Sequence, residues 1–141
     1  MEEKNNPTTK ILIIDDDKDF CYVIKRRLSD LGGYKVLIAK GHNMGLWISH
    51  CRWHRPGLIL LDIMMPGMDG FEVLRRLKKG DITSKIPVVI LTARSDLESK
   101  KRAEGLGCDD YISKPVEAEI LRVRIGEVLA KRHPSPEVNP G

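Results

Sequence analysis

The sequence has no apolar run near the roughly 18 to 20 residues that a membrane-spanning helix needs. Residues 1–6 also lack the basic-then-apolar pattern of a secretory signal. These two absences argue against a membrane protein or an exported one, so we expect a cytoplasmic protein. The 141 residues, 41% apolar and 31% charged, are enough for one globular domain with its own hydrophobic core.

Cysteine is also scarce. Cys21, Cys51 and Cys108 are odd in number, widely spaced and set among apolar residues. This arrangement argues against a disulfide framework and against a zinc site, because both need clustered or paired cysteines. We expect buried, reduced thiols in a reducing compartment.

Aromatic residues make up only 5% of the chain, which bears on its net charge of +4 and its pI of about 9.0. A basic protein can bind nucleic acid, but here the basic residues are dispersed over several helical patterns without an aromatic platform. We therefore expect no direct nucleic-acid binding by this domain. A Gly-x-x-x-x-Gly-Lys-Ser/Thr loop is missing too, which argues against a nucleotide-binding protein of that class.

The chain does contain a regular alternation of short apolar runs and amphipathic stretches. The apolar runs do not alternate with polar residues, as is typical of strands that are buried on both faces. We predict strands at 10–15, 34–39, 58–61, 86–92 and 111–113, and helices at 20–31, 44–52, 71–77, 95–104 and 116–131.

Five strands that alternate with five helices through short loops predict an α/β fold with right-handed crossovers. The expected architecture is a doubly wound, five-stranded parallel sheet in a three-layer α/β/α arrangement, since a barrel would need eight such units. We assign residues 9–131 to this domain, 1–8 to a disordered N-terminus and 132–141 to a Pro-rich tail or linker.

Several local features can be predicted from residue type. Asp69 is expected to cap the third helix, and Ser95 with Glu98 matches a capping box at the start of the fourth. Residues 65–68 are predicted to form a loop. Asp109 and Asp110 are interpreted as solvated loop residues.

Five polar residues follow the apolar runs: Asp15, Asp16, Asp62, Thr92 and Lys114. The carboxyl ends of neighbouring parallel strands lie along one edge of a sheet, where doubly wound folds bind their ligands. Three carboxylates packed together would repel each other unless a cation is present. Oxygen ligands at an open edge suit Mg²⁺, so the sequence predicts a site for a divalent cation and a phosphoryl group.

In combination, these segments resemble the receiver domain of two-component response regulators. The matching segments are Ile-Leu-Ile-Ile-Asp-Asp at 11–16, Leu-Leu-Asp-Ile-Met-Met-Pro-Gly-Met-Asp-Gly at 60–70, Leu-Thr-Ala at 91–93 and Gly-Cys-Asp-Asp-Tyr-Ile-Ser-Lys-Pro at 107–115. The resemblance covers about residues 9–131 and implies the strand order 2-1-3-4-5, which the doubly wound fold is known to adopt in this family.

The resemblance implies a role for each matching residue. Asp62 is expected to accept a phosphoryl group from a phosphohistidine on a sensor histidine kinase or phosphotransfer protein. Mg²⁺ would be held by Asp16, Asp62 and the backbone carbonyl of Met64, with Asp15 acting mostly through water. Lys114 would pair with the phosphoryl group.

The remaining implications concern switching. Thr92 and Tyr111 are expected to form the switch pair, and the peptide before Pro115 is often cis in this family. Phosphorylation would alter the surface of the fourth helix, fifth strand and fifth helix, which is also a candidate homodimer contact. Met64 and Arg94 flank the chemistry, and because methionine cannot orient water we expect a long-lived phosphoryl state.

Other classes remain open at this stage. A Mg²⁺-dependent phosphatase of the haloacid dehalogenase type also uses an aspartyl nucleophile, but it needs a second aspartate where this chain has Met64. A phosphorylation-independent pseudo-receiver, or the receiver of a hybrid histidine kinase, would share most of the motifs. Since no output domain follows residue 131, we expect either a stand-alone receiver or one excised from a larger protein, whose output is unknown.

The second predicted helix is rich in histidine and tryptophan. His50 and His54 have a spacing that can bind zinc on a helix, but without further ligands nearby the sequence does not favour a metal role. Trp47 is predicted to lie in the core. Trp53 lies off that face, either at a partner contact or as a plain surface residue.

Overall fold

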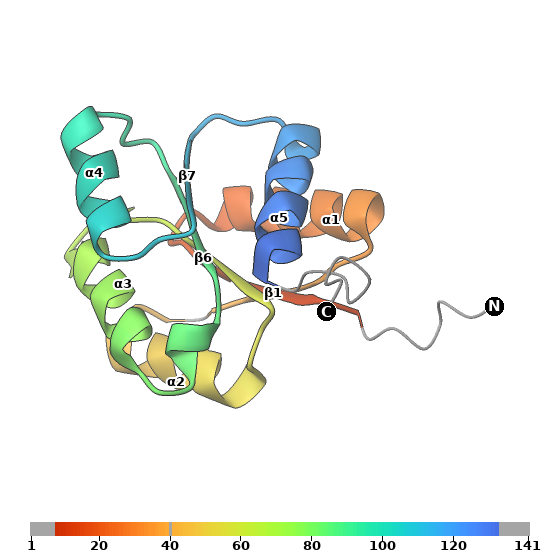
Figure 1. The fold of residues 1–141 in the computed structure, drawn as a ribbon. Helices are drawn as coiled ribbons and strands as arrows, with labels where there is room; N and C mark the ends of the chain where they lie inside the picture. The colour runs from red at the N-terminus through yellow and green to blue at the C-terminus, as the bar shows by residue number, and fades with distance from the viewer. Residues whose placement is uncertain (1–7, 40, 133–141) are drawn as a thin grey trace, which may run out of the picture.

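Five parallel strands form the central sheet of the computed structural model, which describes residues 8–39 and 41–132 (Figure 1). The strand order is β2-β1-β3-β6-β7, which is the predicted order 2-1-3-4-5 when only these five strands are numbered. Their bounds are β1 Lys10–Ile14, β2 Lys35–Ile38, β3 Leu58–Leu61, β6 Val88–Thr92 and β7 Asp110–Ser113. The predicted doubly wound fold is therefore confirmed.

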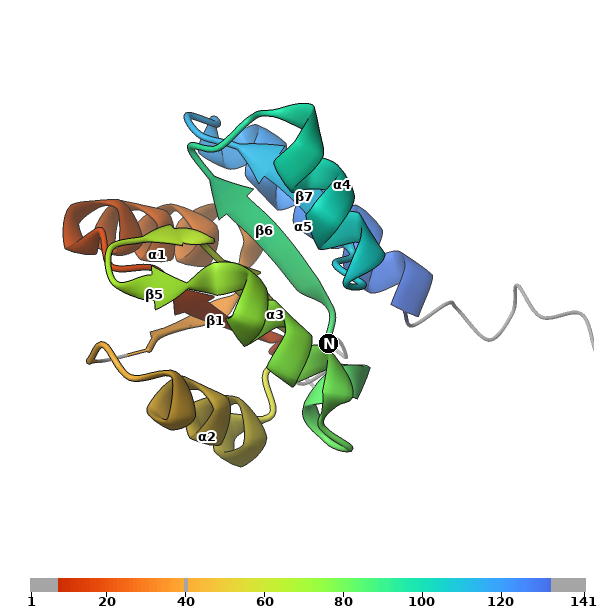
Figure 2. The ribbon, with the colours of Figure 1, turned by 90° about the vertical axis from the view of Figure 1, so that its left-hand side faces the viewer.

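Helices cover both faces of the sheet, as Figures 1 and 2 show. One face carries α1 (Lys18–Gly32) and α5 (Ala118–Arg132). The other carries α2 (Met44–His54), α3 (Gly70–Lys79) and α4 (Leu97–Gly105). The three-layer arrangement follows because α1 to α4 connect parallel strands, α5 follows the last strand, and each helix must bury an apolar side against the sheet.

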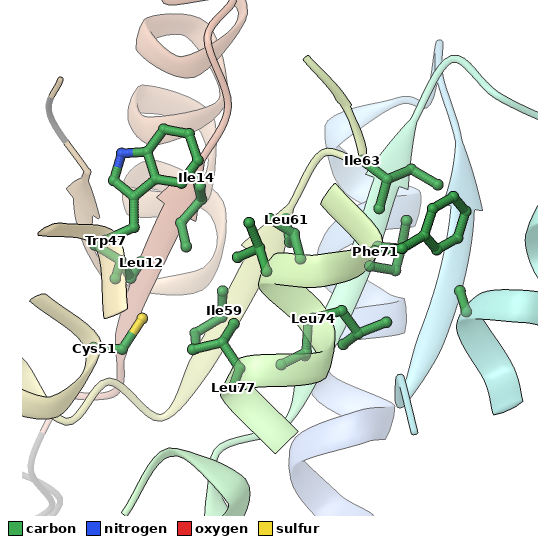
Figure 3. Close-up of a cluster of buried hydrophobic side chains, with 14 of the residues drawn as sticks. Leu12, Ile14, Trp47, Cys51, Ile59, Leu61, Ile63, Phe71, Leu74 and Leu77 are labelled. Atoms are coloured by element: carbon green, nitrogen blue, oxygen red, sulfur yellow. The ribbon is translucent and has the colours of Figure 1, made fainter. Parts of the chain in front are cut away.

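The side chains of β1 show how the sheet divides the core into two clusters. Leu12 and Ile14 point into the cluster beneath α2, α3 and α4 (Figure 3), whereas Ile11 and Ile13 point into the cluster beneath α1 and α5. All four are at most 1% exposed, and full burial of one such side chain stabilises the fold by about 1.5 to 3 kcal/mol. Burial on both faces explains why the strand sequences do not alternate.

Trp47 anchors α2 in the first of these clusters, as predicted. Its side chain is 2% exposed, lies close to Leu12 and Ile14 in Figure 3, and donates its indole N–H to the carbonyl of Gly41 at 3.3 Å. On the same helix Cys51 is fully buried. These two residues fix the inner side of α2, so its opposite side is the one that solvent can reach.

Helix starts agree only partly with the prediction. Asp69 caps α3 by accepting from the Phe71 N–H, as expected. The capping box at Ser95 was wrong, because the cap of α4 is Asp96, whose carboxylate accepts from the Ser99 N–H at 3.0 Å. An aspartate one residue further on competes as a cap, and sequence pattern alone does not rank the two.

Two short elements were not predicted. A hairpin of β4 (Met64–Met65) and β5 (Met68–Asp69) replaces the expected loop at 65–68. A 3-10 turn, η2 (Thr83–Lys85), precedes β6, which therefore begins at Val88 and not at residue 86. Elements of two or three residues are too short to produce a periodic signal in the sequence.

The ends of the chain were also assigned from sequence. The helix α5 continues to Arg132, one residue past the predicted boundary. The predicted disordered N-terminus and Pro-rich tail lie outside the described residues, except for Thr8 and Arg132. Within residues 8–39 and 41–132, every helix is too short or too polar to cross a bilayer.

Candidate functional site

The predicted site residues meet at one edge of the sheet. Asp15 follows β1, Asp62 follows β3, Thr92 ends β6 and Lys114 follows β7, and these strands are neighbours in the sheet. We call this group, together with Asp16, the carboxyl edge. The parallel order of the strands alone brings together residues that are up to 99 positions apart in the sequence.

The acidic residues form a compact cluster. One carboxylate oxygen from each of Asp15, Asp16 and Asp62 lies within 4.8 Å of the others. Asp15 is 9% and Asp62 6% exposed, whereas Asp16 is open to solvent. Among the described residues, this is the one group of three or more acidic, histidine or cysteine side chains close enough to share a metal ion.

Lys114 is the cation that faces this cluster. Its Nζ lies 2.8 Å from Asp15 Oδ2 and 3.3 Å from Asp62 Oδ2, and 4.1 Å above the centre of the Phe20 ring. Burial opposes the charge on the ammonium, but the two carboxylates outweigh that effect and raise the pKa of Lys114. Lys114 is therefore positively charged at neutral pH.

One lysine does not balance the acidic cluster. Burial raises the pKa of the Asp15 carboxyl, and the hydrogen bonds from Lys114 and the Asp17 N–H only partly offset this effect. Within the described part of the chain, no hydrogen bond or ion pair engages the side chain of Asp16. An excess of negative charge with a free, solvent-facing carboxylate fits a hard divalent cation, which binds oxygen ligands and keeps several waters.

Backbone amides fix the orientation of the two buried carboxylates. The Asp17 N–H donates to Asp15 Oδ1 and the Met64 N–H donates to Asp62 Oδ1, both at 2.9 Å. The Oδ2 atoms of both residues are thereby turned toward Lys114. The β4–β5 hairpin, which begins at Met64, is thus attached directly to Asp62.

Thr92 and Tyr111 are connected through Arg94. The Thr92 side chain is fully buried, and its Oγ1 accepts from the Arg94 N–H at 3.3 Å. Tyr111 is 7% exposed and donates its hydroxyl to the Arg94 carbonyl at 2.5 Å. The two residues bond different backbone groups of the same residue, so no pattern of side chains in the sequence could reveal the connection.

The loop after β7 completes the carboxyl edge. The peptide bond between Lys114 and Pro115 is cis. The Lys114 N–H donates to the Thr92 carbonyl at 2.7 Å, which ties the loop to the end of β6.

Asp109 and Asp110, interpreted from the sequence as solvated loop residues, are instead structural. Asp109 accepts from the Val88 N–H at 2.8 Å, from Lys78 Nζ at 3.0 Å and from the Arg132 guanidinium at 3.2 Å. The earlier interpretation was wrong because the partners come from three other elements, and such distant pairings leave no local signal. We call Asp109 and these three partners the amino edge, since they lie where β6 and β7 begin.

Asp110 is held in a similar way. Its two carboxylate oxygens accept from the Arg124 guanidinium on α5 at 2.8 and 2.6 Å. Such a two-point pair fixes orientation as well as charge. Neither Asp109 nor Asp110 belongs to the acidic cluster.

Known proteins with similar sequences belong to one family. A family profile described as "Response regulator receiver domain" matches residues 11–126. Protein PilH of Pseudomonas aeruginosa is 38% identical over 121 residues, which cover 86% of this chain and 98% of that protein. The phosphate regulon transcriptional regulatory protein PhoB of the same organism is 36% identical over 92% of this chain but 56% of its own length. The chain thus spans about half the length of the transcriptional regulators that it matches.

Solved structures show the same similarity. A CheY-like receiver domain protein from Methanospirillum hungatei JF-1 matches with a TM-score of 0.79 and 29% identity over 89% of this chain and 97% of its own. A two-component response regulator from Clostridium difficile matches with a TM-score of 0.79 and 30% identity over 89% of this chain and 99% of its own.

Proposed function

The chain belongs to the response regulator receiver family, and from that premise we propose that Asp62 accepts a phosphoryl group in a Mg²⁺-dependent reaction. The observation that carries the proposal is the acidic cluster, in which Asp62 is nearly buried, held by a backbone amide and faced by one lysine from the part of the chain that the structure describes. A structural role would call for balanced charge, and this cluster is not balanced.

The residues that would hold Mg²⁺ are Asp16, Asp62 and the Met64 carbonyl, with Asp15 acting mostly through water. Oxygen donors and an exposed Asp16 that has no partner among the described residues suit this ion. When bound, the ion neutralises charge on the phosphoryl oxygens. Met64 is 56% exposed and its side chain carries no charge. Only its backbone carbonyl would therefore take part in binding the ion.

In the proposed step, a carboxylate oxygen of Asp62 attacks phosphorus and forms a new O–P bond. The P–N bond to the donor histidine breaks, and its electron pair returns to the imidazole. Lys114 neutralises charge that develops on the phosphoryl oxygens. Thr92 accepts a hydrogen bond from Arg94 N–H, so its own hydroxyl proton is available for a phosphoryl oxygen.

The donor in this proposal is the phosphohistidine of a sensor histidine kinase or phosphotransfer protein that meets the domain in the cytoplasm. The added charge of about −1.5 to −2 would bias Thr92 and Tyr111, and through them the surface of α4, β7 and α5. That surface is also the candidate homodimer contact. The domain then acts as a signalling switch that modifies itself and does not turn over a substrate.

Intact mass after incubation with Mg²⁺ and a small phosphodonor tests the proposal. The native chain should gain one phosphoryl group, and Asp62→Asn should gain none. Asp81→Asn is the matched control, because Asp81 is an exposed aspartate that pairs with Arg52, far along the chain from the site. No gain in the native chain would favour the pseudo-receiver, and a gain that survives in Asp62→Asn would reject Asp62 as the acceptor.

A further inference from the structure

Two half-buried histidines stack on one another along α2. The rings of His50 and His54 lie with centroids 5.7 Å apart and planes 15° from parallel. Residues four apart on a helix share one face, and here both side chains have turned toward one another across a single turn. Trp47 and Cys51 each lie three residues before one of the histidines, so the pair borders the core-facing stripe of the helix, and the burial of Trp47 and Cys51 holds the backbone that carries the two rings in place.

The separation of the ring centroids, though not the stacked orientation of the rings, is close to that of a two-histidine metal chelate. A metal that lies about 2.1 Å from one nitrogen of each ring places the centroids about 5 Å apart in a tetrahedral arrangement. The observed 5.7 Å is close to that value, but the rings are stacked, so each must rotate about its side-chain bonds to turn a nitrogen toward a shared ion, a change that needs no movement of the helix.

The ring nitrogens are available for a ligand. In residues 8–39 and 41–132, neither His50 nor His54 takes part in a hydrogen bond or an ion pair. His42 differs, because its Nε2 lies 2.9 Å from the Pro66 carbonyl. Both rings of the α2 pair are half-buried, which limits the number of rotamers that must be frozen when a ligand binds.

The charged groups around the two histidines predict a modest affinity for metal ions and a preference for transition metals over Mg²⁺. Arg52 and Arg55 are close in the sequence and repel a cation, although Arg52 is paired with Asp81 at 3.4 Å. The negative end of the helix dipole at the last turn of α2 acts in the opposite direction. Without a carboxylate from α2, the pair offers imidazole nitrogen alone, which suits Zn²⁺, Ni²⁺ and Cu²⁺ and not Mg²⁺.

We propose that His50 and His54 form an open site for a divalent transition metal, separate from the acidic cluster and with water in the remaining coordination positions. Copper should bind most tightly and zinc less tightly, following the usual order of affinity for nitrogen ligands. The site goes beyond phosphorylation, since it lies on a helix that contributes no residue to the carboxyl edge.

Trp53 provides a reporter within the site. Its side chain is 83% exposed and lies between the two histidines in the sequence, whereas Trp47 is 2% exposed. Bound Cu²⁺ should therefore quench the long-wavelength emission of Trp53. The titration is run in excess Mg²⁺ to occupy the acidic cluster, and every protein compared carries His133→Asn, because that residue lies outside the described part of the chain.

The expected result is saturable quenching with one Cu²⁺ per chain. Either His50→Asn or His54→Asn should weaken binding at least tenfold, because each removes half of the chelate, and His42→Asn should leave it unchanged. Thermal melting gives a second measurement that does not depend on fluorescence: Zn²⁺ should raise the Tm of the parent but of neither single variant. Quenching that persists in both single variants, or that never saturates, would overturn the proposal.

Discussion

The two edges of the sheet carry similar residues and use them differently. At the amino edge, Asp109 is met by one amide and two cations, Lys78 and Arg132. At the carboxyl edge, Asp15 and Asp62 share one lysine, and Asp16 adds a third carboxylate without a partner among the described residues. A buried charge whose partners are all present is satisfied, and removing one partner is costly, whereas an unbalanced cluster is kept at a cost and indicates a ligand.

The largest effect expected from this comparison concerns thiol reactivity, which tests whether both edges are equally well packed. Cys21 donates to the Asp15 carbonyl beneath the carboxyl edge, and Cys108 precedes Asp109. Burial, assisted by nearby carboxylates, raises the pKa of Cys21 to about 12 and that of Cys108 to about 11. At pH 8, alkylation by iodoacetamide should be about a thousandfold slower at Cys21 than in the unfolded chain.

Cys108 should react faster than Cys21, since it is only half-buried and its pKa is lower. Mass spectrometry after timed labelling measures both rates in one sample, with guanidinium-unfolded protein as the reference. Rapid labelling of Cys21 in the native protein would show that the carboxyl edge is loosely packed. The difference in charge balance between the two edges could then reflect loose packing and would no longer indicate a ligand.

The next effect concerns stability. Asp109→Asn keeps an acceptor for the Val88 N–H but loses two ion pairs, so the free energy of unfolding should fall by about 1 to 3 kcal/mol. Asp62→Asn removes one of three crowded carboxylates, so in Mg²⁺-free buffer this free energy should stay within about 1 kcal/mol of the native value or rise. Urea denaturation of both variants with a chelator present measures the difference. An equal fall in the free energy of unfolding for both variants would contradict the expected difference between the two edges.

The smallest effect concerns the lifetime of the phosphoryl group. The Met64 side chain is 56% exposed beside Asp62 and cannot orient a water molecule. Met64→Asn should shorten the lifetime several-fold, because an amide can position water, while Met68→Asn in the same hairpin should not. Decay followed by intact mass after removal of the phosphodonor measures both, and an unchanged lifetime in Met64→Asn would reject the role of this side chain.

The carboxyl edge was predictable from sequence because each of its residues is marked by its position at the end of an apolar run. Asp15, Asp62 and Thr92 each end or follow an apolar run, and parallel strands place such ends together. The fold was predictable for the same reason, since strands buried on both faces have a distinctive composition. The amino edge was not predictable, because Asp109 finds its partners in β6, α3 and α5, and no short pattern records such pairings.

Other details depended on competition between neighbours. Ser95 and Asp96 are both good helix caps, and the backbone of the loop after β6 selects Asp96. The β4–β5 hairpin depends on Gly67, whose φ of 71° permits the tight turn between strands of two residues each. The stacking of His50 on His54 could not be predicted, because it depends on the side-chain rotamers of both residues, and their spacing in the sequence does not determine these.

Thr92 and Tyr111 belong to neighbouring strands, yet both are attached to the two sides of one residue, Arg94. Both hydrogen bonds therefore depend on the position of this one backbone segment. If rotation of the Thr92 side chain carries Oγ1 away from the Arg94 N–H, that N–H loses its acceptor, and the segment that anchors the tyrosine hydroxyl becomes less constrained. A change at a fully buried hydroxyl can therefore reach the segment before the exposed start of α4 through the backbone of a single residue.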